Sequence, residues 1–102
     1  MDIDMNAARE FIAERYAKQG DFDFLPEETF NAMLNRLVEI DSAYIDEIGD
    51  SRPYDEDEAF ERMQTALLKE HPQQKAYVMR FVDDYLDFME QYLVTMDMVE
   101  WE

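Results

Sequence analysis

Several residue types that common enzyme chemistry depends on are missing from this chain or rare in it. The 102 residues include no cysteine, one histidine, two glycines and three prolines. Without cysteine, disulfide bonds, thiol nucleophiles and thiolate metal sites are all excluded. Because glycine and proline are the usual breakers of regular structure, their scarcity favours a few long elements over many short ones.

Signals for β-structure are also weak. No Asn-Gly or Asp-Gly pair marks a hairpin turn, and β-branched residues are sparse. Hydrophobic residues still make up 47% of the chain and aromatic residues 14%, so the composition is not that of a disordered protein. We therefore predict one all-α domain over residues 1–102, a bundle of three to four helices with a long C-terminal helix at its centre.

Basic residues are few. Nine lysines and arginines stand against 26 acidic residues, which gives a formal net charge of −17. Such a chain repels nucleic acid and anionic membrane surfaces, because both are bound through clustered lysines and arginines. We therefore expect neither as a direct partner. The charge either attracts a basic protein or serves solubility alone.

Membrane-spanning and secretory signals are absent as well. No run approaches the roughly 18 apolar residues of a membrane span. The first ten residues, MDIDMNAARE, are acidic where a secretory signal would be basic and then apolar. The expected location is cytoplasmic.

Capping and breaking residues divide the chain into four predicted helices. They cover about residues 4–19, 26–48, 56–70 and 72–97. Asp2 or Asp4 caps the first helix, and Gly20 ends it. Pro26 and Pro72 stand at the first positions of the second and fourth helices.

Two local features complete this division. Asp55, followed by Glu58 three residues later, has the spacing of a capping box at the start of the third helix. In the connection 20–25, Phe22 and Phe24 alternate with aspartates. We expect both rings to pack under the bundle while the carboxylates stay in water.

The stretch 72–102 is the most apolar part of the chain. Its apolar residues recur every three or four positions along one stripe, at Val78, Val82, Tyr85, Met89, Tyr92, Met96 and Val99. The stripe is widened by Tyr77, Phe81, Phe88 and Leu93. A helix this apolar must be covered by other helices or by another chain.

One carboxylate interrupts the apolar stripe of the second helix. The stripe consists of Phe30, Leu34, Leu37, Tyr44 and Ile48, and Asp41 falls on it. An unpaired buried carboxylate is costly. Asp41 therefore either faces water at a helix crossing or is paired, in which case Arg80 is the candidate partner.

The patterns of common catalytic and metal sites are missing. The single histidine, His71, precedes a proline at a predicted helix end, and the chain has neither a nucleophile elbow nor a phosphate-binding glycine loop. Asp83, Asp87 and Glu90 share one face of the last helix, but the Glu-x-x-His pairs of di-iron bundles are absent. The acidic segment 50–61 lacks calcium-loop spacing. We predict no catalytic residue, cofactor or metal.

The predicted function is a non-enzymatic protein-interaction module. Its apolar binding surface would consist of Tyr92, Met96, Met98 and Trp101, since thioethers repack around varied partners. The same surface would serve a homodimer formed through the last helix. The partner is another protein, and a basic one if the charge takes part in binding.

The alternative is an acidic nucleic-acid mimic that inhibits a DNA- or RNA-binding protein. A mimic would act through carboxylates placed like phosphates. The candidates are Asp55, Glu56, Asp57 and Glu58, together with the acids of the second helix. Salt would abolish binding of this kind, because exposed charges are screened.

Overall fold

The computed structural model describes residues 4–49 and 51–95, and this part of the chain forms four α-helices. The helices span Met5–Gln19 (α1), Glu27–Ile48 (α2), Glu56–Glu70 (α3) and Lys75–Thr95 (α4), and a 3₁₀ turn, η1, occupies Pro72–Gln74. No strand occurs in the described residues. The all-α bundle is confirmed, and each helix lies within a few residues of its predicted range.

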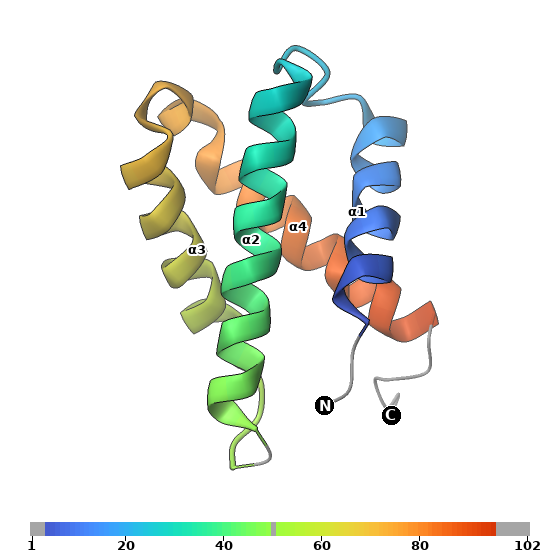
Figure 1. The fold of residues 1–102 in the computed structure, drawn as a ribbon, viewed down its shortest axis with the longest axis vertical. Coiled ribbons are helices and arrows are strands. Elements are labelled where there is room, and N and C mark those ends of the chain that lie inside the picture. Colours follow the sequence, from blue (N-terminus) through green and yellow to red (C-terminus); the bar gives the residue numbers. More distant parts are fainter. Residues whose placement is uncertain (1–3, 50, 96–102) are drawn as a thin grey trace.

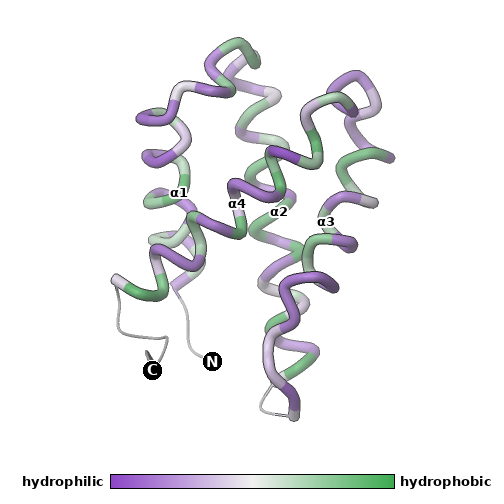
Figure 2. Tube along the Cα trace, turned by 180° about the vertical axis from the view of Figure 1, so that it is seen from behind, coloured by the Kyte–Doolittle hydropathy of each residue, from purple (hydrophilic) through white to green (hydrophobic). Residues whose placement is uncertain are grey.

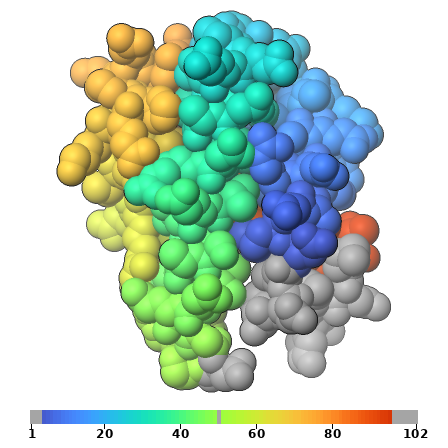
Figure 3. Space-filling model, viewed as in Figure 1, coloured from blue at the N-terminus to red at the C-terminus, as the bar shows by residue number. Residues whose placement is uncertain are grey.

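Three helices form a layer that the fourth crosses. In Figure 1, α1, α2 and α3 lie side by side and alternate in direction, and α4 runs obliquely behind them. The space-filling view in Figure 3 shows α2 filling the middle of the front face, so that little of α4 is visible. From behind, α4 crosses in front of the layer (Figure 2). The last helix packs most closely on α3 and α1 and meets α2 through side chains such as Phe81, whose ring contacts that of Phe30.

Aspartates cap two helices as the sequence predicts. Asp4 Oδ1 accepts hydrogen bonds from the backbone N–H groups of Asn6 and Ala7, both at 3.1 Å. Asp55 Oδ1 likewise accepts bonds from the second and third residues of α3, at 3.0 and 3.4 Å. The capping box is only half formed, because the Asp55 N–H donates to the Tyr44 hydroxyl at 3.2 Å instead of to Glu58.

The prolines sit slightly differently from the prediction. Pro26 is the cap residue of α2, with ψ of 142°, so the helix begins at Glu27. Pro72 opens η1 instead of α4. His71 has φ of −130° and ψ of 60°, as expected for a residue that proline bars from the helical region. The 3₁₀ turn redirects the chain from α3 into the oblique α4.

Aromatic rings from α1, the first connection, α2 and α4 meet at one end of the core. The Tyr16 ring stacks on that of Phe81 with centroids 4.8 Å apart and meets Phe22, Phe30 and Phe88 edge-on, at 5.7, 5.4 and 5.0 Å. The Tyr16 hydroxyl donates to the backbone carbonyl of Phe81. Edge-to-face packing and a satisfied hydroxyl together fix how α4 crosses α1.

The connection between α1 and α2 buries only one of its two phenylalanines. Phe22 is 5% exposed, whereas Phe24 is 55% exposed and lies against Tyr77, with ring centroids 4.7 Å apart. The prediction that both rings pack under the bundle is wrong for Phe24. Tyr77, which the stripe of α4 was expected to bury, is 40% exposed. The two rings remain neighbours, with centroids 6.2 Å apart, but only Phe22 lies inside the core.

The remaining core residues of α2 and α4 follow the predicted stripes closely. In α4 the buried residues are Val78, Phe81, Val82, Tyr85, Leu86, Phe88, Met89 and Tyr92. In α3 they are Ala59, Met63 and Leu67, and in α2 they include Asp41 among apolar side chains. The helices thus pair apolar faces, with one carboxylate inside.

Candidate functional site

Asp41 is buried in the middle of the bundle between two tyrosine hydroxyls. Its side chain is fully inaccessible. The Tyr54 hydroxyl donates to Oδ1 at 2.6 Å and the Tyr85 hydroxyl to Oδ2 at 2.9 Å. We call these three residues the Asp41 cluster. It joins α2, the connection between α2 and α3, and α4 through charge-assisted hydrogen bonds.

Burial is the main influence on the pKa values of this cluster. Desolvation raises the pKa of Asp41 above its usual value of 3.8, and the two tyrosine hydrogen bonds partly oppose that rise. Burial, followed by the nearby Asp41 charge, raises the pKa of both tyrosines. Each hydroxyl therefore stays protonated and remains a donor.

The predicted pairing of Asp41 with Arg80 is wrong, and so is the alternative that Asp41 faces water. Arg80 lies on the outer side of α4, where it pairs with Asp21 of the first connection. A guanidinium carried into the core would lose much of its hydration, whereas tyrosines satisfy a carboxylate while burying their rings. The position of Asp41 on the apolar stripe was a sequence signal for its burial. Its tyrosine partners are distant in the sequence, so no local spacing could identify them.

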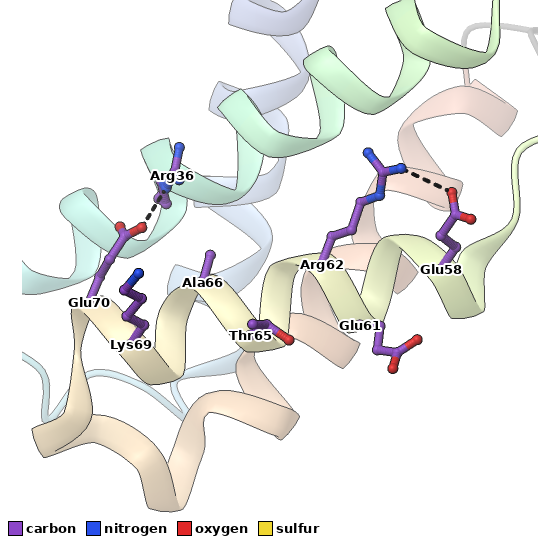
Figure 4. Close-up of a pocket in the computed structure, with 8 residues that line it drawn as sticks. All are labelled: Arg36, Glu58, Glu61, Arg62, Thr65, Ala66, Lys69 and Glu70. Carbon is purple, nitrogen blue, oxygen red and sulfur yellow. Dashed lines mark hydrogen bonds and ion pairs between the residues drawn. The ribbon is translucent and has the colours of Figure 1, made fainter.

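An open groove of about 510 Å³ runs between α2 and α3 (Figure 4). Arg36 bonds Glu70 at 3.0 Å near one end, and Arg62 lies 3.4 Å from Glu58 near the other. Its other lining residues include Lys69, Thr65 and Ala66. The groove therefore carries nearly balanced charge on a very acidic chain.

Further ion pairs near the end of α2 extend this balance of charge. Arg62 also bonds Glu47 at 2.6 Å, and Arg52 bonds Glu58 at 3.1 Å. Both guanidinium groups lie over the Tyr44 ring, with centroid distances of 4.8 and 5.7 Å. The hydrogen bond from Arg52 is the main cause of a lowered Glu58 pKa. Exposed pairs of this kind add little stability individually, but they neutralise this face.

Acidic residues without basic partners in the described part of the chain gather where the start of α3 meets the outward side of α4. Glu56 and Asp57 begin α3, and Asp83, Asp87 and Glu90 are exposed on α4. Within residues 4–49 and 51–95, none of these five carboxylates makes a salt bridge. We call these five residues the acidic face.

The carboxylates of the acidic face lie close enough to repel one another across the two helices. Partial burial raises the pKa of Glu56, and repulsion from Glu90, Asp57, Asp83 and Asp87 raises it further. Like charges brought close together favour the neutral form. The face thus concentrates negative charge contributed by helices that are distant in the sequence.

The predicted partner-binding residues are distributed unevenly. Tyr92 is 5% exposed and its ring packs 5.5 Å from that of Phe11, so it belongs to the core. Met96, Met98 and Trp101 lie outside the described residues. Of the acidic quartet, Asp55 caps α3 and Glu58 binds arginines, which leaves Glu56 and Asp57 on the acidic face. The spacing of Asp83, Asp87 and Glu90 had predicted that the other three members of this face lie on one side of the last helix.

The single histidine lies at the end of α3. His71 caps α3 through its backbone N–H, which donates to the Leu67 carbonyl at 2.7 Å. Among the described residues, no three His, Asp or Glu side chains are placed to hold a metal ion. In those residues no helix is both long and apolar enough to cross a membrane.

Comparison with known proteins adds no relative. No family model matches the chain, and no curated protein or solved structure is significantly similar to it.

Proposed function

We propose that this chain is a small, non-enzymatic protein-interaction module that binds a basic partner through its acidic face. The observation that carries the proposal is the asymmetry of charge pairing. On the α2–α3 side, carboxylates are matched by Arg36, Arg52 and Arg62. On the acidic face, five carboxylates of the described chain have no such partner.

Repulsion among unpaired carboxylates held at close range destabilises the free protein, and a basic partner would reduce that repulsion. Repulsion from these neighbours adds to partial burial in raising the pKa of Glu56. A complementary positive surface would lower the repulsion and speed diffusional encounter. The acids stand on two packed helices, so their backbone needs no ordering on binding, which lowers the entropic cost of association.

Affinity capture with matched baits tests the proposal. The first bait carries Asp83→Asn, Asp87→Asn and Glu90→Gln, which neutralise the α4 part of the face. The control bait carries Glu10→Gln, Asp46→Asn and Glu61→Gln, which remove the same charge from exposed positions elsewhere. A nuclease-treated lysate of the source organism supplies partners, and mass spectrometry identifies what rising salt elutes.

We expect the wild-type and control baits to retain the same basic protein, and the acidic-face bait to lose it. Loss of a retained protein from both triple variants alike would point to net charge without a defined face. Retention by all three baits would overturn the proposal.

A nucleic-acid mimic is the second candidate, favoured by the row of carboxylates on α4. Asp83, Asp87 and Glu90 stand at i, i+4 and i+7, which places them along one side of a rigid helix. Double-stranded DNA or RNA added to the captured complex should release the partner of a mimic. A partner unaffected by nucleic acid would rule this candidate out.

Homodimerisation through the C-terminal helix is a separate proposal. Light scattering across a hundredfold concentration range tests it, with a chain truncated after Val94 as the comparison. A dimer lost on truncation would support it, and a monomer at every concentration would refute it.

A further inference from the structure

A small apolar pocket lies between α1, the first connection and the start of α2, apart from the acidic face. Its volume is about 190 Å³. Ala13 and Ala17 of α1 leave the space open, because their side chains end at the β-carbon. Drug-sized ligands occupy sites of about 300–1,000 Å³, so this pocket suits a single inserted side chain.

The wall of the pocket is aromatic and held by the core. Tyr16, Phe22 and Phe30 line it, and the Tyr16 ring meets the other two edge-on. Gly20 ends α1 with φ of +77°, a conformation that turns the chain so that Phe22 packs back on the bundle. The wall therefore exists before any partner arrives.

Asp23 supplies the one charge among the lining residues. Within the described chain, its side chain makes no salt bridge. The segment 19–35 around it contains Asp21, Glu27 and Glu28 as further acids and no lysine or arginine. Arg80 pairs with Asp21, so the negative charge at the rim of the pocket comes from Asp23, while the wall is apolar.

We propose that this pocket receives an arginine side chain from the basic partner, an inference that rests on the proposed function. The guanidinium pairs with Asp23, and the aliphatic stem and guanidinium plane pack on the rings of Phe22 and Phe30. A neutral apolar side chain would leave the exposed Asp23 carboxylate without a partner, whereas a guanidinium forms a charge-assisted pair with it. Lysine lacks the planar group that stacks on aromatic faces and binds carboxylate through two bonds.

The experiment is a titration of the isotope-labelled full chain, followed by backbone amide NMR. The probe is the nonapeptide Arg-Gly-Arg-Gly-Arg-Gly-Arg-Gly-Arg, and peptides with lysine or leucine in place of arginine are compared with it. Asp23→Asn removes the rim charge, with Asp46→Asn as the control of equal net charge. Ala17→Leu fills the pocket, and Ala43→Leu makes the same change at an exposed site on α2.

We expect the arginine peptide to shift the amides of residues 13–30. Because one partly screened charge pair is lost, Asp23→Asn should weaken binding about fivefold and Asp46→Asn less than twofold. Ala17→Leu should abolish the local shifts while its spectrum stays folded, and Ala43→Leu should behave as wild type. The lysine peptide should bind more weakly than the arginine peptide.

The outcomes separate this inference from the proposed function. If the arginine peptide binds but Asp23→Asn and Asp46→Asn weaken it equally, the pocket inference is wrong and the proposed function stands. If the leucine peptide binds as tightly as the arginine peptide, the pocket takes an apolar side chain and the inference is overturned. If neither basic peptide shifts the amides of residues 13–30 at low salt, the pocket inference is refuted, and the affinity capture alone then decides the proposed function.

Discussion

The Asp41 cluster makes a stability prediction that can be worked from its geometry. Tyr85→Phe removes a donor 2.9 Å from a carboxylate that is fully inaccessible to solvent. Hydrogen bonds to charged groups contribute about 1.5–3 kcal/mol, and water cannot easily replace this one. We expect the free energy of unfolding to fall by about 2 kcal/mol, which lowers the Tm of a domain this size by roughly 10 °C.

Chemical denaturation at two pH values measures this effect. The matched control is Tyr77→Phe, which deletes a hydroxyl from a ring that is 40% exposed. At pH 7 Tyr85→Phe should cost more than Tyr77→Phe. The difference should shrink as the pH falls towards 4, because a protonated Asp41 forms only neutral hydrogen bonds, which are weaker.

The result that would refute this reasoning is equally specific. If the two Tyr→Phe variants differ by less than about 0.5 kcal/mol at pH 7, the Tyr85 hydroxyl does not support a buried charge. A cost that is the same at both pH values would show that Asp41 does not change its protonation state between them.

Four further predictions concern titration, a helix cap, a helix end and the core. Burial raises the pKa of Asp41, so its contribution to stability is present below its ordinary value of 3.8 and is lost as the pH rises through the folded-state pKa. Wild type should therefore lose more stability than Asp41→Asn between pH 4 and 7 in urea titrations. Asp55→Ala should cost about 1 kcal/mol by removing the α3 cap, and Asp55→Asn should cost little, as measured by thermal unfolding. Gly20→Ala should cost about 1 kcal/mol because φ there is +77°, and an equal melting temperature would contradict this. Met63→Ala should cost about 2–5 kcal/mol in denaturant titrations, since Met63 is fully buried.

Local chemistry was enough to predict the helices. Asp4 and Asp55 cap because their carboxylates reach the free N–H groups of the next residues, and that reach depends only on neighbouring positions. The apolar stripes of α2 and α4 were likewise readable, because a period of 3.6 residues puts spaced side chains on one face. Within the candidate sites, the spacing of Asp83, Asp87 and Glu90 predicted that they share a face.

Tertiary structure decided which residues from distant segments meet. Tyr54 and Tyr85 reach Asp41 only because the connection after α2 folds back and α4 crosses obliquely, and this crossing angle depends on packing around Tyr16. Glu56 joins the acids of α4 for the same reason. The sequence by itself determined the class of fold, the four helices and the acidity, because these follow from composition and short-range periodicity. The buried carboxylate's partners, the acidic face and the aromatic pocket depend on long-range packing, which one-dimensional spacing does not encode.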